Sequence, residues 1–300
     1  MIKRTLYFGN PAYLSKKDEQ LVVKLQEKEE ERSIPIEDIG VVILDHQQIT
    51  ITQGALQTLI ENNAAVISCD DSHHPLGLMM PLSSHTLQSA RFRDQIEASE
   101  PLKKNLWAQT VKAKIINQGL MLKQYDKNVN VLRELARSVT SGDGNNCEAR
   151  AAAIYWRELF GPEFNRERYG EPPNNLLNYG YAILRAIVAR GLVSSGLLPT
   201  LGIHHRNQYN AFCLADDIME PYRPFVDMLV KKMYDPANSL NYAKLTTAHK
   251  KELLAIATVD VYFKKDRSPL MVGMQRTTAS LSRCYQQQQR NLEYPFLYET

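Results

Sequence analysis

The hydrophobic pattern of the chain changes once, near residue 85. Before that point, short apolar runs separated by turn-forming residues predict strands at residues 5–8, 21–25, 41–44, 49–51 and 65–69. One helix is predicted among them, over residues 53–61. There Leu56, Leu59 and Ile60 recur at helical spacing, and Thr52 is a suitable N-cap. We therefore expect the first part of the chain to be rich in β-structure.

Beyond residue 86 the apolar residues recur with a period of 3.6 instead of two, which is typical of helices. The predicted helices cover residues 88–97, 102–123, 129–139, 147–159, 176–194, 211–220, 225–233, 248–263 and 271–292. Strands followed by helices favour an α+β fold with segregated elements. We predict a small β-rich domain over residues 1–80, followed by a larger all-α catalytic domain over residues 81–300.

Composition and charge add little about function. The chain has 300 residues and a net charge of +3, so a basic surface for nucleic acid would have to come from an uneven distribution of its 36 Lys and Arg. Its four cysteines are scattered and form no CxxC pair. They therefore favour reduced thiols over a disulfide framework or a zinc knuckle.

The sequence shows no clear membrane or export signal. Gly9, Asn10 and Pro11 interrupt the apolar run that a signal peptide needs. The most apolar helix candidate, residues 181–198, contains Arg185 and Arg190 and is a poor candidate for a membrane span. We expect a soluble, cytoplasmic protein.

The segment 204–224 is the richest candidate for a functional site. It contains two histidines, three carboxylates and two arginines. Asp217 and Glu220 are three positions apart, so on a helix they share one face and repel each other unless a cation lies between them. Pro221 is expected to end that helix just after Glu220. Asp217 and Glu220 together therefore predict a binding site for a hard metal ion.

A second candidate is the segment 141–160. Asp143, Asn145 and Asn146 are possible N-caps for a helix beginning close to Glu148. Along that helix Glu148 shares a stripe with apolar residues, and a buried carboxylate needs a cation or a hydrogen-bond network. Alternatively, Glu148 merely favours the helix N-terminus through the dipole. The stripe alone does not decide between these two interpretations.

The remaining candidates are histidines and basic residues. Of His204 and His205, one is expected to be structural, and the other could join two or three carboxylate oxygens in a site that suits Mn²⁺ and tolerates Mg²⁺. Arg206 and Arg223 are candidates for phosphate contacts because guanidinium binds phosphate bidentately. Lysines could follow a nucleic-acid backbone, although each is equally explained as a solubilising residue: Lys103, Lys104, Lys112 and Lys114.

Two motifs carry a resemblance to a known family. The segments GIHHRNQYNAFCLADDIMEPYRP and CEARAAAIYWRELFG resemble the two signatures of the CRISPR-associated integrase family Cas1, in its type II form. The resemblance implies that Glu148, His205 and Glu220 are catalytic ligands of Mg²⁺ or Mn²⁺, with Asp217 as an adjacent carboxylate. His204 is not a fixed ligand in that family.

The resemblance also implies partners and a reaction. The first domain would mediate a homodimer, and a Cas2 dimer would bridge two such dimers on double-stranded DNA. The type II effector nuclease and an accessory adaptation protein are further implied partners. The reaction would be insertion of short DNA fragments into the CRISPR array, with DNA endonuclease activity.

Two other functions are weighed against this one. The first is a non-catalytic DNA-binding scaffold whose carboxylates are structural. The second is a metal-dependent RNA nuclease, for which the sequence offers no stacking motif of the RNA-binding modules.

Overall fold

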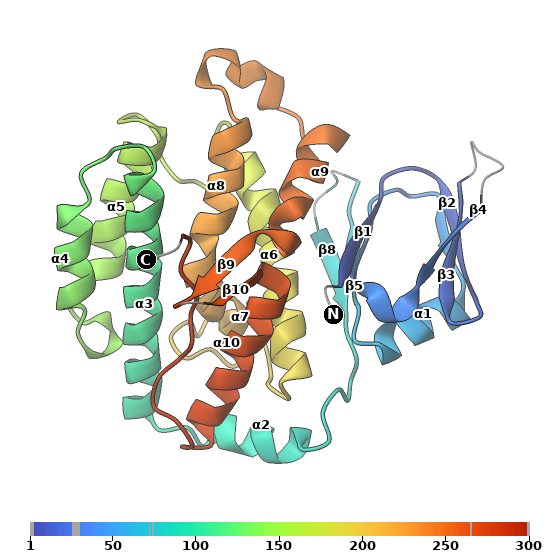
Figure 1. Cartoon of the computed structure of the whole chain (residues 1–300), viewed down its shortest axis with the longest axis horizontal. Coiled ribbons are helices and arrows are strands. Elements are labelled where there is room, and N and C mark those ends of the chain that lie inside the picture. Colours follow the sequence, from blue (N-terminus) through green and yellow to red (C-terminus); the bar gives the residue numbers. More distant parts are fainter. Residues whose placement is uncertain (1–2, 26–30, 72, 74, 265, 299–300) are drawn as a thin grey trace. The chain divides into compact units, whose positions relative to one another are not determined.

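A computed structural model describes residues 3–25, 31–71, 73, 75–264 and 266–298. The chain divides into two compact units, residues 1–86 and residues 87–300 (Figure 1). The first unit is built from strands and one α-helix, and the second is mainly helical. The predicted α+β fold class is confirmed.

Two four-stranded sheets form the first unit. One sheet has the order β1-β5-β7-β8, with β1, β5 and β7 parallel and β8 antiparallel to β7. The other has the order β4-β3-β2-β6, in which only the β2–β6 pair is parallel. The strands are β1 (Arg4–Phe8), β2 (Ala12–Lys17), β3 (Gln20–Leu25), β4 (Glu31–Pro35), β5 (Ile39–Leu44), β6 (Ile49–Ile51), β7 (Ala65–Cys69) and β8 (Pro75–Met79).

The two sheets share one apolar core; five of the described strands were predicted from apolar runs, whereas β2, β4 and β8 were not. Leu14 and Leu21 from one sheet, Ile39 from the other and Leu59 from the helix α1 (Gln53–Glu61) belong to the same buried cluster. The helix begins as predicted, because the Thr52 hydroxyl accepts a hydrogen bond from the backbone N–H of Ala55.

The second unit is a bundle of α-helices joined by short 3₁₀ turns. The α-helices are α2 (Gln88–Ile96), α3 (Glu100–Lys123), α4 (Asn130–Ser138), α5 (Cys147–Phe160), α6 (Asn174–Ser194), α7 (Cys213–Met219), α8 (Arg223–Met233), α9 (Thr247–Leu254) and α10 (Leu270–Tyr285). The 3₁₀ turns are η2 (Ser141–Asp143), η3 (Glu220–Tyr222), η4 (Pro236–Tyr242) and η5 (Ala255–Thr258) in this unit, and η1 (Ile36–Asp38) in the first.

Two long helices form the centre of this bundle. Helix α3 packs against α4, α5 and η3, and α6 packs against α7, α8 and α10. By length and composition, α6 could cross a membrane, but 78% of its most apolar window is buried inside the protein. This burial is typical of a core helix.

Two predicted helices of the second unit are wrong at their C-terminal ends. The helix expected over residues 248–263 ends at Leu254, and the chain then forms β9 (Asp260–Phe263), paired with β10 (Asp266–Pro269). Val261, Tyr262 and Phe263 favour a strand, because β-branched and aromatic side chains pack well on a pleated surface. The last helix ends at Tyr285 instead of continuing to residue 292.

Candidate active site

Helix α3 provides a buried polar stripe in a helix that is otherwise packed with apolar residues. Thr110, Lys114, Asn117 and Gln118 are all buried. The Asn117 amide donates to the backbone oxygens of Pro221 and Pro295, at 2.8 and 3.0 Å. These bonds hold the η3 turn and the C-terminal segment against α3.

Glu148 lies in the first turn of α5. The cap is made by Asp143, whose carboxylate accepts the N–H groups of Cys147 (2.9 Å) and Glu148 (3.0 Å). Asn146 occupies the N-cap position in a left-handed conformation without a side-chain cap bond. The side chain of Glu148 is 26% exposed, so it is only partly removed from water.

Glu220 lies at the junction between α7 and α8. Helix α7 ends at Met219, one residue before the predicted end at Glu220, and the chain continues through η3 directly into α8. Proline is tolerated there since it lies in the first turn of η3, where its missing N–H costs no internal hydrogen bond. Glu220 is 4% exposed and is brought next to α3 by this turn.

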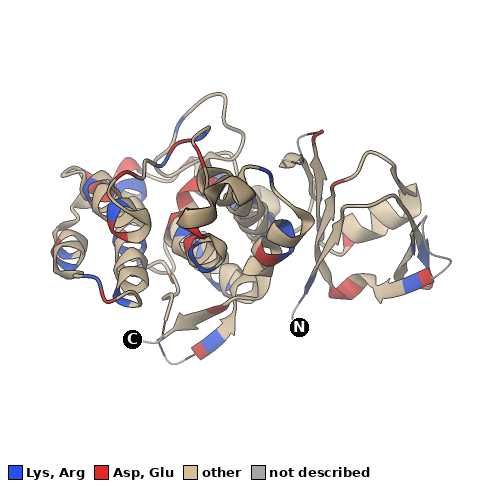
Figure 2. Ribbon diagram, turned by 90° about the horizontal axis from the view of Figure 1, so that it is seen from above, with Lys and Arg blue, Asp and Glu red and all other residues tan. Residues whose placement is uncertain are grey.

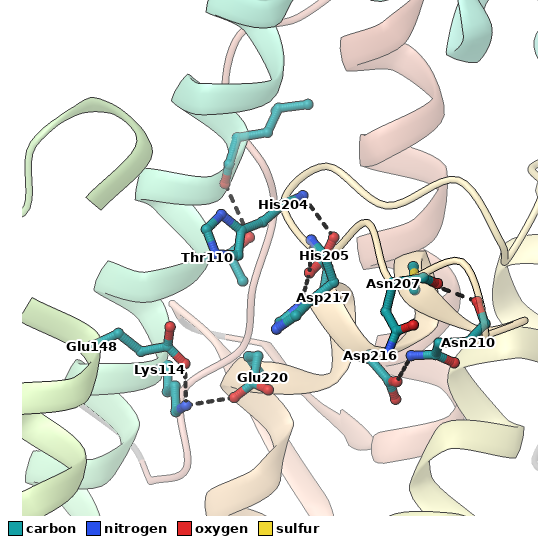
Figure 3. A network of polar contacts seen from close by, with 12 residues as sticks. Thr110, Lys114, Glu148, His204, His205, Asn207, Asn210, Asp216, Asp217 and Glu220 are labelled. Atoms are coloured by element: carbon teal, nitrogen blue, oxygen red, sulfur yellow. Dashed lines mark hydrogen bonds and ion pairs between the residues drawn. The ribbon is translucent and has the colours of Figure 1, made fainter. Parts of the chain in front are cut away.

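Lys114 joins the two glutamates. Its ammonium nitrogen lies 2.6 Å from Glu148 Oε1 and 2.5 Å from Glu220 Oε2 (Figure 3). The second contact is an ion pair without hydrogen-bond alignment, so among the described residues Glu220 Oε2 is a buried oxygen with no hydrogen-bond donor. Arg223 contacts the other oxygen of Glu220 at 2.9 Å. The position of Glu148 on an apolar stripe predicted a cation or a hydrogen-bond network beside its carboxylate. The structure shows that this partner is Lys114.

The loop before α7 places His205 beside this group. Both carboxylate oxygens of the fully buried Asp217 are occupied by the loop: they accept the backbone N–H groups of His204 and His205, at 2.9 and 3.3 Å. Asp217 Oδ1 also lies 2.5 Å from His205 Nδ1. A side chain at Gly202 would lie 2.8 Å from Asp217 Oδ2, so glycine permits the close approach.

Trp107 on α3 supports the same loop. The His204 imidazole stacks on the Trp107 ring with centroids 4.1 Å apart and planes 2° apart. His205 meets the same ring edge-on at 5.8 Å. In Figure 3 the His205 imidazole lies between Asp217 and the group of Glu148, Lys114 and Glu220. The structure thus gives His204 a stacking contact and leaves His205 facing the carboxylates.

The charges at the site stabilise one another. Burial disfavours the charged form of Glu220, but Arg223 and Lys114 outweigh it and lower the Glu220 pKa. Burial also disfavours the Lys114 ammonium, yet Glu220 and Glu148 raise its pKa overall. The hydrogen bond to Asp217 raises the His205 pKa above its ordinary value. Glu220 is therefore ionised and Lys114 is charged near neutral pH.

The predicted site residues are only partly brought together. Glu148 and Glu220 meet at Lys114 with His205 beside them, whereas Asp217 faces the loop. Arg206 pairs with Glu100 on α3 at 2.5 Å, and Lys103 lies near the same carboxylate at 3.9 Å. Lys104 is exposed, and Arg223 lies beside Glu220 with its guanidinium 4.8 Å from the centre of the Tyr181 ring. In Figure 2 both signs of charge occur side by side on the helices of this unit.

Lys114 is the residue that the sequence interpretation missed, since it was grouped with surface lysines. A signal exists in the sequence. Leu106, Thr110 and Lys114 are spaced by four on α3, and Trp107 and Val111 flank them, so Lys114 lies within an apolar stripe. A lysine in such a stripe needs a buried partner.

The donor set fits a hard divalent cation. Nowhere in the described part of the chain do three His, Cys, Asp or Glu side chains lie close enough to hold a metal ion. The Lys114 ammonium instead lies between Glu148 and Glu220, and Glu220 Oε2 has no hydrogen-bond donor. Two carboxylates and an imidazole are ligands that Mg²⁺ or Mn²⁺ accepts. The residues are therefore compatible with such an ion.

Comparisons with known proteins identify the family to which the chain is similar. The family described as "CRISPR associated protein Cas1" matches residues 6–239. The chain is 36% identical over 282 residues to a CRISPR-associated endonuclease Cas1 of Neisseria meningitidis, covering 93% of this chain and 91% of that protein.

Solved structures share the fold. One is titled "Casposase bound to integration product" (TM-score 0.73, 21% identity, 98% of this chain and 94% of that one). Another is titled "Cas6-RT-Cas1--Cas2 complex" (TM-score 0.72, 22% identity, 99% of this chain and 36% of that one). At this identity, the two structures establish the likeness of fold alone.

Proposed function

This chain belongs to the Cas1 family, and from that premise we propose that it is a metal-dependent DNA integrase with endonuclease activity. In the proposed reaction, the 3′-hydroxyl of a short DNA fragment attacks a phosphodiester of the CRISPR repeat. A new P–O bond forms while the 3′-oxygen of the cut repeat strand leaves. With water as the nucleophile, the same site would hydrolyse DNA. The observation that carries the proposal is the contact of Glu148 and Glu220 with one cation, Lys114, with His205 held beside them by Asp217.

Each of these side chains has a role that its surroundings support. Glu148, Glu220 and His205 would hold the ion. When bound, Mg²⁺ or Mn²⁺ supplies Lewis-acid stabilisation of the charge on the phosphate and on the leaving oxygen. Asp217 occupies Nδ1 of His205, which leaves Nε2 as the ring nitrogen for a ligand and fixes the orientation of the ring. Asp217 thus acts as a positioning residue that assists the ligands.

The proposed partners are DNA and further protein chains. Residues 1–80 would mediate a homodimer, and a Cas2 dimer would bridge two such dimers on double-stranded DNA. The fold is shared with solved structures whose titles name an integration product and a Cas6-RT-Cas1--Cas2 complex, which supports DNA and Cas2 as partners. We place the protein in the cytoplasm, in a type II system with its effector nuclease and an accessory adaptation protein.

Four basic residues are proposed to contact the DNA backbone. Arg206 and Lys103 lie around Glu100, and Lys104 is exposed on the same helix. Arg223 lies 2.9 Å from Glu220 and its side chain is 28% exposed, so it is an accessible basic residue next to the proposed metal ligands. Arginine and lysine neutralise phosphate charge, so loss of any of them is expected to weaken binding at every sequence and to reduce its salt dependence.

The proposal is tested by strand transfer of a labelled short duplex into a supercoiled plasmid that carries a repeat array, with the Cas2 partner and Mg²⁺ or Mn²⁺. We compare the wild type with Glu148→Gln. The matched control is Glu158→Gln, also on α5, where the side chain is 44% exposed and lies 3.5 Å from Lys127. We expect metal-dependent joining by the wild type and the control, and none by Glu148→Gln.

Two outcomes would contradict the proposal. Joining by Glu148→Gln at the wild-type rate would remove Glu148 from the site. If the wild type shifts the duplex on a gel but neither joins nor cuts DNA with either metal, the protein is better explained as a DNA-binding scaffold with structural carboxylates.

A further inference from the structure

The position of Lys114 goes beyond what the proposed function explains. Its ammonium touches Glu148 and Glu220, the two carboxylates that the proposed function assigns to a divalent cation (Figure 3). The Lys114 side chain is only 11% exposed, so this contact is not an incidental surface pair. The lysine and the divalent cation would need the same oxygen atoms.

The charges explain why a cation is needed there in the absence of metal. Two carboxylates at one site repel each other, and because Glu220 is buried the low local dielectric constant makes that repulsion costly. With Lys114 and Arg223 in place, Glu148 and Glu220 are balanced by two positive charges. A divalent ion added without the departure of Lys114 would bring the net charge of this group to +2, whereas departure of Lys114 limits it to +1.

We propose that Lys114 is a resident counter-ion, which holds the two carboxylates together in the metal-free protein and is displaced from them when a divalent cation binds. This inference rests on the proposed function, because it takes Glu148 and Glu220 as metal ligands. Displacement requires only the side chain to move. Lysine carries its charge on a flexible four-carbon stem, whereas the backbone of α3 is fixed to the neighbouring turn by Asn117.

The geometry favours exchange over a permanent bridge. The contact of Lys114 with Glu220 Oε2 lacks hydrogen-bond alignment, so the ammonium satisfies that buried oxygen by charge alone. A divalent cation brings twice the charge and prefers carboxylate oxygens as ligands. The affinity of the site for metal is therefore set partly by the cost of moving Lys114.

Metal binding by the purified full chain, without DNA, tests the proposal directly. Free Mn²⁺ is measured by electron paramagnetic resonance during titration of the wild type and of Lys114→Gln. The neutral variant loses the competing charge, so we expect its Mn²⁺ dissociation constant to fall about tenfold. The matched control is Lys112→Gln, an exposed lysine on the same helix, for which we expect no change.

A second variant and a stability measurement cover the case in which Lys114→Gln folds poorly. Lys114→Arg keeps the charge and can hold carboxylates in a bidentate way, so we expect it to bind Mn²⁺ more weakly than the wild type. We also expect the metal-free Lys114→Gln protein to unfold at a lower temperature than the wild type, and added Mn²⁺ to reverse that loss.

Different Mn²⁺-binding results would contradict the counter-ion proposal and the proposed metal site. If Glu148→Gln removes Mn²⁺ binding but Lys114→Gln binds no more tightly than the wild type, the metal site stands and the counter-ion proposal is wrong. Binding by Lys114→Arg that is as tight as the wild type also overturns the counter-ion proposal. If the wild type binds Mn²⁺ no better than Glu148→Gln, the metal site itself fails and the inference fails with it.

Discussion

Glu220 and Asp227 are buried carboxylates seven residues apart, one in η3 and one in α8, yet their surroundings differ completely. Glu220 is 4% exposed and contacts two cations, Lys114 and Arg223. Asp227 is 1% exposed and accepts hydrogen bonds from the hydroxyls of Tyr155 (2.8 Å) and Tyr181 (2.5 Å). The chain thus stabilises one carboxylate with charges and the other with neutral donors.

The consequences for protonation are opposite. Burial opposes ionisation at both positions. At Glu220 the cations outweigh it, so the pKa is lowered. At Asp227 burial outweighs the tyrosine hydrogen bonds, so the pKa is raised to about 6. Glu220 is therefore kept as an anion that can bind a metal ion, whereas Asp227 can hold a proton close to neutral pH. What surrounds a buried carboxylate, more than its burial, decides which chemistry it can perform.

The largest expected effect is a difference in strand-transfer rate between substitutions at the two carboxylates. Glu220→Gln removes an anionic ligand from the proposed metal site, so strand transfer should fall by about 10³-fold or more. Asp227→Asn keeps the shape of a side chain that touches no proposed ligand, and joining should stay within about threefold of the wild type. The rate of strand transfer is measured with DNA binding as a control.

Equal losses of joining in both variants, with both proteins folded and bound to DNA, would mean that Asp227 belongs to the catalytic site as well.

Much of the fold is predictable because its core residues follow simple periods. In the first unit, short apolar runs and the Thr52 cap identify α1 and five of the eight described strands, whereas β2, β4 and β8 were not predicted. The start of α5 was also predicted close to Glu148. The stretch 260–263 was missed because a short apolar run after a helix has no period long enough to distinguish strand from helix.

The site was predictable in its members but not in its contacts. Spacing placed Asp217 and Glu220 on one helical face with a cation between them. In the structure, Asp217 is occupied by the backbone of the histidine loop, and Glu220 reaches Lys114, 106 positions earlier in the chain. Local spacing carries no information about such long-range partners. A buried lysine and a surface lysine also look alike in sequence unless the stripe around Lys114 is examined.

The next largest expected effect is a pH dependence of the free energy of unfolding, which follows from the raised pKa of Asp227. Between the unfolded value near 3.8 and the folded value of about 6, the folded protein holds a proton at Asp227 that the unfolded chain has lost. The contribution of Asp227 to the free energy of unfolding therefore falls as pH rises through this window. Asp227→Asn removes that dependence, so its stability relative to the wild type should rise by about 2 kcal/mol between pH 4.5 and pH 7.

Urea denaturation of both proteins at the two pH values measures this difference. Asp126→Asn, at an exposed carboxylate, controls for the change in net charge. A difference that is the same at both pH values would show that Asp227 holds no extra proton in the folded protein. The contrast with Glu220 would then be lost.

The smallest expected effect concerns Arg223, which belongs to both regions. Its guanidinium pairs with Glu220 and also lies 4.8 Å from the centre of the Tyr181 ring, whose hydroxyl donates to Asp227. Arg223→Lys keeps the positive charge but loses the planar group above the ring, so we expect the free energy of unfolding to fall by about 1 kcal/mol.

A double-mutant cycle with Tyr181→Leu isolates the contribution of the ring, with Arg150→Lys on the exposed side of α5 as the matched control. If Arg223 stabilises the fold through Tyr181, the two substitutions should cost less together than the sum of their separate effects, because each removes the same contact. If the two changes in the free energy of unfolding are strictly additive, Arg223 stabilises the protein through Glu220 and not through the Tyr181 ring. The cation-rich site and the tyrosine-bonded carboxylate would then be energetically independent, although the same arginine lies beside both.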